Sequence, residues 1–245
     1  MNGDQTFSTA GQVVSGLDIH GFVRITAKNV TLKDSIVRGG VNPPCNSAVI
    51  YVTSGASATI EDTEVNPSNA NACLDGVWAE NATLLRMNIH GSVDGVKADD
   101  NVTVKDSYIH DMARFASDPN QGGGPTHNDA VQSWQGNVNV SLLHNTLDPG
   151  NGGNAAYQVT QDGGRRAYNL RVDGNWLDGG GCTLNFSSKG GPTPMTGIYV
   201  DNNRFGRHSF YNCPILLSTQ TKLSSNSGNV WDDTGLPVPP PQVHD

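Results

Sequence analysis

The feature that most constrains this chain is an internal repeat, in which a small polar residue is followed two positions later by an apolar one. Successive copies lie 28, 24, 20, 38, 30, 28 and 26 residues apart, so the shortest unit is 20 residues and the longer units carry loops. A unit this short cannot bury its own apolar face, whereas stacked units bury a continuous core. The first positions of the copies are Ser35, Thr63, Met87, Ser107, Asn145, Asn175, Asn203 and Asn229, with Met87 as the degenerate member.

Each copy ends a run in which apolar and polar residues alternate, such as NVTLKDS at 29–35 and NVTVKDS at 101–107. Alternation with β-branched residues predicts a strand with one buried face. A second short strand precedes each run, as in DGVKAD at 94–99 and DAVQSW at 129–134, and a third short strand, such as YIHDM at 108–112, follows. One repeat therefore holds three short strands and a Gly- or Asn-rich turn.

These observations predict an all-β chain that forms a single-stranded, right-handed parallel β-helix of about eight coils with three parallel sheets. A β-sandwich is the main competitor, but Asn-Gly or Asp-Gly hairpin turns rarely separate adjacent strands here. The Asn that recurs at one turn also favours the helix, because Asn tolerates the left-handed region and can hydrogen-bond to its copy in the next coil. We expect the β-helix over residues 1–234 and a Pro-rich linker or tail over 235–245 that leads to further domains.

The composition supports an all-β fold and argues against some classes of binding partner. Glycine accounts for 29 of 245 residues and charged residues for 16%, which is typical of a turn-rich β protein. The net charge of −8 argues against a nucleic-acid partner. No apolar run is long enough to span a membrane, and the first residues show no signal-peptide pattern.

The four cysteines gain meaning from the repeat. Cys45 and Cys73 stand before the first strands of successive coils, and so do Cys182 and Cys213. Equivalent positions in adjacent coils lie about 4.8 Å apart, which is close enough for a disulfide. We expect the pairs Cys45–Cys73 and Cys182–Cys213, and hence an oxidising, extracellular setting.

The chain resembles the pectate-lyase-like superfamily of right-handed parallel β-helices over roughly residues 12–231. The phrases GVKADDNVTVKDSYIHDM, HNDAVQ, DGNWLDGG and NNRFGR are similar to β-helix modules of secreted actinobacterial proteins and phage tail proteins. The resemblance implies a glycan lying along the first sheet, and a secreted or virion-surface location. The VWIDH-like and RxPxxR motifs of pectate lyases, the GHG and RIK motifs of polygalacturonases and the DPHE motif of alginate epimerases are absent, so no single enzyme family is indicated.

Aligning the first strands predicts which side chains face outward. Val77, Val96, Val131, Tyr157 and Leu184 share an inward position, and the next residue of each strand should face solvent. Aromatic and amide side chains on such a strip suit a sugar polymer. The predicted substrate-binding residues are Trp78, Gln132, Trp134, Gln158 and Asn185, and the 14-residue loop at 113–126 is expected to form a wall over Lys97 and Gln132.

Two chemistries fit this groove. In β-elimination a cation or Ca²⁺ neutralises a uronate carboxylate while a base removes a proton, and the predicted catalytic residues are Lys97, Asp99, Arg114, His127 and Asp129, with His110 as a further candidate. Asp94, Asp99 and Asp129 are candidate calcium ligands. In hydrolysis Asp99 and Asp129 would form the carboxyl pair, with Glu80 in reserve.

Several candidates also have structural explanations. Lys97 can be a solvated charge, Asp94 and Asp129 can cap turn amides, and His90 with His110 can form a structural ladder. We expect a polysaccharide lyase acting on an acidic glycan, with a glycoside hydrolase as one alternative. A non-catalytic glycan-binding or phage tail receptor-binding module on the same strip is the other.

Overall fold

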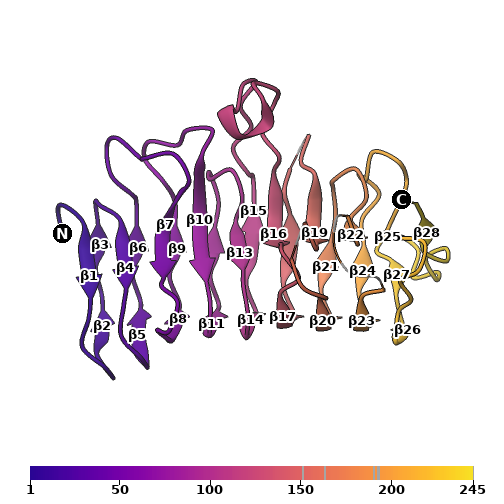
Figure 1. Ribbon diagram of the computed structural model, residues 1–245, viewed down its shortest axis with the longest axis horizontal. Helices are drawn as coiled ribbons and strands as arrows, with labels where there is room; N and C mark the ends of the chain where they lie inside the picture. The colour runs from indigo at the N-terminus through magenta and orange to yellow at the C-terminus, as the bar shows by residue number, and fades with distance from the viewer. Residues whose placement is uncertain (151, 163, 190, 192–193, 245) are drawn as a thin grey trace.

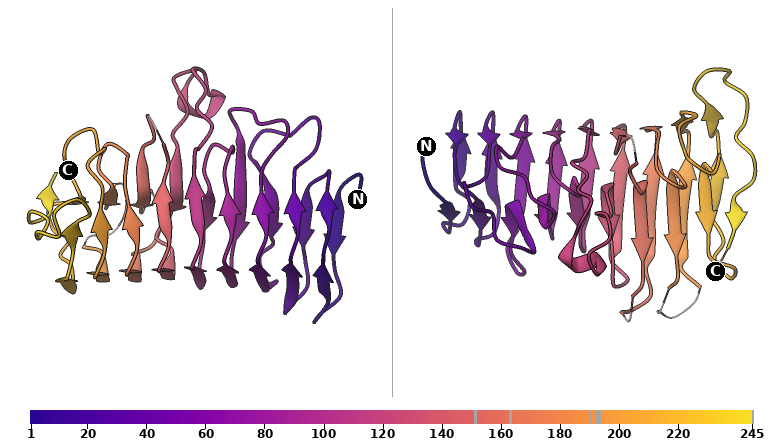
Figure 2. Two further views of the ribbon diagram at one scale, coloured as in Figure 1. Left: turned by 180° about the vertical axis from the view of Figure 1, so that it is seen from behind. Right: turned by 90° about the horizontal axis from the view of Figure 1, so that it is seen from above.

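The computed structural model describes residues 1–150, 152–162, 164–189, 191 and 194–244. Within them the chain winds as a parallel β-helix, with its coils stacked along one axis and its termini at opposite ends (Figures 1 and 2). Three parallel sheets of ten, nine and nine strands run the length of the stack, and one short 3₁₀ helix, η1 (Pro119–Gln121), is the described helical element. The predicted fold is confirmed. The coils outnumber the expected eight because a first coil, over residues 5–19, precedes the first repeat copy, and a further strand follows residue 231.

The first sheet carries the strands that were aligned from the sequence. Its order follows the chain, and every neighbouring pair is parallel. Its strands are β1 (Gln5–Phe7), β4 (Val23–Ile25), β7 (Ser47–Val52), β10 (Leu74–Ala79), β13 (Val96–Ala98), β16 (Asp129–Ser133), β19 (Ala155–Thr160), β22 (Leu184–Ser187), β25 (Ile215–Leu217) and β28 (Gln242–Val243).

The second sheet is built from the alternating runs that precede each repeat copy. Its strands are β2 (Val13–Ser15), β5 (Val30–Lys33), β8 (Ala58–Glu61), β11 (Ala82–Leu85), β14 (Val102–Lys105), β17 (Val138–Leu143), β20 (Tyr168–Asp173), β23 (Thr196–Asp201) and β26 (Ser225–Ser227). The third sheet has β3 (Asp18–Ile19), β6 (Ile36–Val37), β9 (Glu64–Val65), β12 (Asn88–Ile89), β15 (Tyr108–His110), β18 (Thr146–Asp148), β21 (Trp176–Leu177), β24 (Arg204–Phe205) and β27 (Val230–Trp231).

The repeat signature marks the turn between the second and third sheets. Asn145 donates to Asn175, and Asn175 to Asn203, each with an Nδ2–Oδ1 distance of 3.0 Å, so the predicted hydrogen bonding between copies is confirmed. The left-handed backbone lies one residue earlier than expected, at residues such as His144 and Asn202. This shift leaves the repeating Asn buried, where it satisfies backbone groups that the turn would otherwise orphan.

Both predicted disulfides are present. Cys45–Cys73 and Cys182–Cys213 each join adjacent coils with a Cα–Cα distance of 4.7 Å. Two disulfides are typical of proteins from oxidising compartments. In the described part of the chain, no helix is long and apolar enough to cross a membrane.

The C-terminal segment differs from the expected linker. β28 pairs with β25 as the tenth strand of the first sheet, and Val238 packs against the core. Residues 235–244 therefore cover the end of the β-helix, whereas Asp245 lies outside the described residues. The apolar residues between the prolines explain this return, because the last coil would otherwise leave core side chains in water.

Candidate functional site

A row of outward side chains crosses the first sheet as predicted. Trp78 pairs in register with Lys97, Lys97 with Gln132, Gln132 with Gln158, and Gln158 with Asn185. The residues one position earlier in these strands, Val77, Val96, Val131, Tyr157 and Leu184, are fully buried, which confirms the assignment of faces. We call this line the outward row; four of its five members are half-buried, and Gln158 is buried among its neighbours' side chains.

The alternation is interrupted one residue before these buried positions. A Cβ built on Gly95 would lie 2.4 Å from Ile109 Cγ2, and one on Gly76 would lie 2.9 Å from Ile89 Cγ2, so both glycines face the core. Two successive residues of each strand therefore point inward, as happens where a strand carries an extra residue. The residue before each glycine consequently faces outward, on the same side as the outward row.

This irregularity creates a column of three aspartates. Asp75, Asp94 and Asp129 occupy equivalent positions in three successive coils, and each is almost fully buried. Asp75 Oδ1 accepts from the backbone N–H of Asp94 at 3.3 Å, and Asp94 Oδ1 accepts from that of Asp129 at 2.8 Å. Asp94 therefore does accept from a backbone amide, but that amide belongs to Asp129 at the start of β16 in the next coil and not to a turn.

The other oxygen of each aspartate contacts the outward row three residues later. Asp75 Oδ2 accepts from Trp78 Nε1 at 2.6 Å and lies 2.8 Å from Lys97 Nζ. Asp94 Oδ2 lies 3.6 Å from the same ammonium, and Asp129 Oδ2 accepts from Gln132 Nε2 at 3.2 Å. Lys97 is therefore enclosed by two buried carboxylates rather than exposed as a free charge.

The electrostatics follow from this enclosure. Burial raises the pKa of Asp94 well above its usual value, and the neighbouring carboxylates of Asp75 and Asp129 raise it further. Burial lowers the pKa of Lys97, but the charges of Asp75 and Asp94 outweigh that effect and leave the pKa raised. A lysine with a raised pKa gives up its proton less readily, so this environment does not favour Lys97 as the base.

His127 and Asp129 form a second charged pair at the end of the aspartate column. His127 Nδ1 lies 3.1 Å from Asp129 Oδ2, within ion-pair distance but without hydrogen-bond alignment. Burial lowers the pKa of His127, but the Asp129 carboxylate outweighs it, so the pKa is raised above the usual value. The imidazole is about one-third exposed, so it is accessible to a ligand, whereas Asp129 is fully buried.

Three amide side chains continue the site beyond His127. Asn154 Nδ2 lies 2.5 Å from His127 Nε2, and Gln158 Nε2 lies 3.3 Å from the same atom. Gln158 Oε1 accepts from both Asn154 and Asn185, at 2.8 and 3.2 Å. Since amide NH₂ groups are donors, they face the lone pair of a neutral imidazole at Nε2.

Some buried polar atoms on the first sheet or just before it have no hydrogen-bond partner. Among the described residues they are four: His127 Nδ1 and Asp129 Oδ1, which face each other's side chains, Asn185 Oδ1 on the outward row, and Thr160 Oγ1, which lies level with Trp134 at the opposite end of the strands. Buried polar groups are nearly always satisfied in folded proteins, so each exception requires an explanation. A ligand that hydrogen-bonds to these atoms would supply one.

The predicted wall rises from the edge where the first-sheet strands begin. The loop at 113–126 is closed at its base by Phe115 and Thr126, whose backbones are joined at 3.0 Å, and it projects beyond the neighbouring connections (Figure 1). Arg114, at the start of the loop, packs against Gly152 of the next coil. The Arg114 Nε lies 3.2 Å from the position that a Cβ on Gly152 would take. Arg114 is exposed, and none of the ion pairs among the described residues includes it.

Asp99, Glu80 and Trp134 lie at the opposite end of the strands. Burial raises the pKa of Asp99 to about 6, with Glu80 and Asp100 adding to the shift. Asp94 is the register equivalent of Asp129, and Asp99 lies five residues further along the same chain segment. Five extended residues span about 16 Å. Paired glycosidase carboxyl groups lie roughly 5–9.5 Å apart, so Asp99 and Asp129 do not form the predicted hydrolytic pair.

The same spacing bears on the calcium hypothesis. Asp94 and Asp129 are adjacent, but Asp94 contacts Lys97 and the Asp129 amide, Asp129 contacts His127 and Gln132, and Asp99 lies apart from both. No group of three or more His, Cys, Asp or Glu side chains among the described residues is arranged to hold a metal ion. The residues present do not fit a calcium site of the predicted composition.

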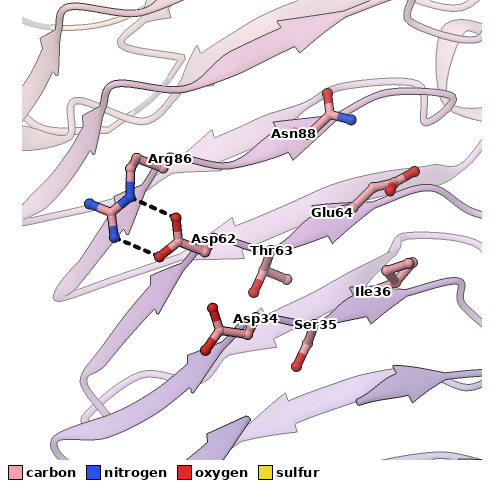
Figure 3. Close-up of a pocket in the computed structure, with 8 residues that line it drawn as sticks. All are labelled: Asp34, Ser35, Ile36, Asp62, Thr63, Glu64, Arg86 and Asn88. Atoms are coloured by element: carbon pink, nitrogen blue, oxygen red, sulfur yellow. Dashed lines mark hydrogen bonds and ion pairs between the residues drawn. The ribbon is translucent and has the colours of Figure 1, made fainter. Parts of the chain in front are cut away.

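Hollows elsewhere on the surface lack these features. One, of about 300 Å³, lies where the second sheet turns into the third and is crossed by the ion pair of Arg86 with Asp62 (Figure 3). Another, of about 490 Å³, follows the turn between the first and second sheets, from Asn29 to Asn101. The predicted ladder of His90 and His110 is confirmed, with ring centroids 5.0 Å apart on the third sheet and away from the outward row.

Sequence reasoning missed two members of the site, Asp75 and Asn154. The phrase Asp-Gly-Val occurs at both 75–77 and 94–96, so it could have identified Asp75. Asn154 precedes AAYQ just as Asn128 precedes DAVQ, but Asn128 is buried and bonds to the backbone, and nothing in the sequence distinguishes their roles.

Comparisons with known proteins add little to this geometry. No protein-family model and no curated protein matches the sequence. A solved structure of trypsin-treated QnrB1, described as a plasmid-mediated fluoroquinolone resistance protein, aligns at 10% identity over 95% of this chain and 92% of that chain, with a TM-score of 0.21. A likeness at that TM-score supports no inference about function, so the fold assignment rests on the sheet topology above.

Proposed function

We propose that this protein binds a polysaccharide along the outward row and cleaves a uronate-containing chain by β-elimination beside His127. The observation that carries the proposal is the accessible imidazole of His127 beside buried Asp129, together with two buried acceptors that have no hydrogen-bond partner among the described residues, Asp129 Oδ1 and Asn185 Oδ1. Asp129 Oδ1 and Asn185 Oδ1 can only accept hydrogen bonds, and sugar hydroxyls are donors of the matching kind. The resemblance to pectate-lyase-like β-helices and the two disulfides support an acidic glycan met outside the cell.

His127 is the residue best suited to remove the proton. Its Nε2 carries the lone pair when the ring is neutral, and Asp129 stabilises the imidazolium that forms. In the reaction the C5 proton passes to Nε2, the electrons of that bond form the C4–C5 double bond, and the C4–O bond breaks. The leaving oxygen takes a proton from water. The substrate would displace the Asn154 and Gln158 amides from Nε2, freeing both to bind hydroxyls.

Arg114 is the residue best suited to neutralise the uronate carboxylate. Hydrogen bonds from Asn128 to the Ala113 carbonyl at 2.7 Å, and from Asn154 to the Asn128 carbonyl at 2.6 Å, place the start of the loop beside the strands that carry His127 and Gln158. A guanidinium presents paired donors that match a carboxylate. Lys97 is already balanced by Asp75 and Asp94, which leaves Arg114 as the available cation at this edge.

Incubation with a panel of uronic-acid polymers tests the reaction, because a lyase releases unsaturated products that absorb ultraviolet light. We expect the wild-type protein to release them and His127→Gln to lose at least about 100-fold in rate. His20→Gln, at an exposed position of the third sheet, is the control and should retain full activity. Since the pKa of His127 is raised and the base must be neutral, kcat/KM should rise with pH through a value above about 6.5. A rate independent of His127 would exclude this mechanism.

A non-catalytic glycan-binding module is the second candidate. The hydrogen bonds of Asn154 and Gln158 to His127 Nε2 favour it, because they occupy the atom that must accept the proton. This candidate predicts binding to the same polymers without unsaturated products and without new reducing ends. A phage tail receptor-binding module would show this behaviour with a bacterial surface glycan.

A further inference from the structure

The outward row extends beyond the residues that the sequence singled out. Arg24 pairs in register with Tyr51, and Tyr51 with Trp78. The Arg24 guanidinium lies 5.1 Å from the centroid of the Tyr51 ring, and the Tyr51 and Trp78 rings meet edge to face at 5.5 Å. Lys97 Nζ lies 5.7 Å from the Trp78 ring on the other side. Two aromatic rings are thus bracketed by two cations.

The two cations differ in how their charge is balanced. Lys97 is held by Asp75 and Asp94, whereas Arg24 is exposed and has no carboxylate partner among the described residues. Other arginines of the chain are paired in this way: Arg38 with Asp18, Arg86 with Asp62, Arg165 with Asp100, Arg171 with Asp173, Arg204 with Asp232 and Arg207 with Asp233. Arg24 therefore resembles Arg114, and differs from these six, in carrying a charge that no described carboxylate balances.

We infer that Arg24, Tyr51 and Trp78 form a subsite for an anionic sugar residue of the same chain that reaches His127. Aromatic faces pack against the C–H face of a sugar ring, and a guanidinium binds a carboxylate or a sulfate through two parallel hydrogen bonds. Trp78 is held in place because its Nε1 donates to the buried Asp75 at 2.6 Å. The subsite rests on the proposed function for the identity of its ligand as a glycan.

The position of the subsite determines its effect. Four strand steps, through Tyr51, Trp78 and Lys97, separate Arg24 from Gln132, which amounts to about 19 Å along the stack. A sugar bound there is remote from the reacting bond and is held equally in the ground state and the transition state. Such binding changes KM and affinity but leaves kcat nearly unchanged.

The test measures binding by calorimetry on a His127→Gln background, so that no polymer is consumed. The probes are a polyuronate, its methyl ester, a sulfated galactan and a neutral glucan. We expect Arg24→Gln to weaken polyuronate binding at least about 10-fold and to reduce its salt dependence, with little change for the methyl ester. Weakening confined to the sulfated polymer would assign the subsite to sulfate. Arg171→Gln, which removes a cation paired with Asp173 on the second sheet, is the matched control and should bind as the background does.

The outcomes separate this subsite from the proposed reaction. If Arg24→Gln binds every acidic polymer as tightly as the background, or if no acidic polymer binds, the subsite is refuted whatever the lyase assay shows. If Arg24→Gln loses affinity while the wild-type protein releases no unsaturated product, the subsite stands and the β-elimination is refuted. Tyr51→Leu should weaken binding to both the polyuronate and its methyl ester, because it removes the ring surface but not the charge.

Discussion

Replacing Lys97 with Met tests the enclosure of an ammonium by two buried carboxylates. The side chains of Asp75 and Asp94 are each only 5% exposed and that of Lys97 is 25% exposed, so the variant leaves two buried carboxyl groups without a cation. Breaking a buried pair on one side costs about 3–5 kcal/mol, and the partial exposure of Lys97 places the expected loss near 3 kcal/mol. For a chain of this size that loss lowers the melting temperature by roughly 6–12 °C.

The pH dependence of this loss identifies its cause. The pKa of Lys97 is raised in the folded state, so Lys97 contributes its full share to the free energy of unfolding at any pH below the pKa of lysine in the unfolded chain. That contribution fades only at strongly alkaline pH. Because the pKa of Asp94 is raised, the folded state holds that proton above the unfolded value of about 3.9, and removing Lys97 raises the pKa further. The loss in the variant should therefore be largest near neutral pH and shrink as the pH falls toward about 4.

Urea unfolding at neutral and mildly acidic pH, with equal m-values as a check on cooperativity, measures the effect. Lys105→Met removes a half-exposed lysine of β14 that faces Asp106 at 3.7 Å, and it should change stability by less than about 1 kcal/mol. Combining Lys97→Met with Asp75→Asn and Asp94→Asn should recover most of the loss, because no buried charge then remains unpaired. A loss below about 1 kcal/mol, or one that is equal at both pH values, would refute the reasoning.

Three further changes test the fold around the site, each followed by urea unfolding. Gly95→Ala would place a Cβ 2.4 Å from Ile109 Cγ2 and should cost about 1–3 kcal/mol; a neutral result would contradict the inward direction of this position. Replacing both Cys182 and Cys213 with Ser opens a link across 31 residues and should cost about 3–4 kcal/mol in the chain-entropy treatment; added reductant, which also opens Cys45–Cys73, should lower the stability of the parent protein at least as far. Removing residues 235–245 takes away β28 and the cover over the last coil and should cost about 1–2 kcal/mol, whereas an unchanged midpoint would support the original expectation of a free linker.

The sequence by itself determined the architecture, because a short repeat with alternating strands has few ways to bury its apolar face. The buried valines at 77, 96 and 131 and both disulfides followed from the same spacing, since equivalent residues of stacked coils must be neighbours. The outward row from Trp78 to Asn185 was predictable for the same reason. These features depend on the period of the chain and on little else.

Only the tertiary structure decided how the charged residues meet. Alternation alone assigns Asp94 to the same face as Val96, yet the core contact of Gly95 with Ile109 of the third sheet reverses that assignment. Asp94 then reaches Lys97, and Asp129 reaches His127, while Asp99 remains about 16 Å along the strand from Asp129. The direction of a side chain at an irregular strand depends on what the opposite sheet places across the core, and a local sequence period carries no information about that contact.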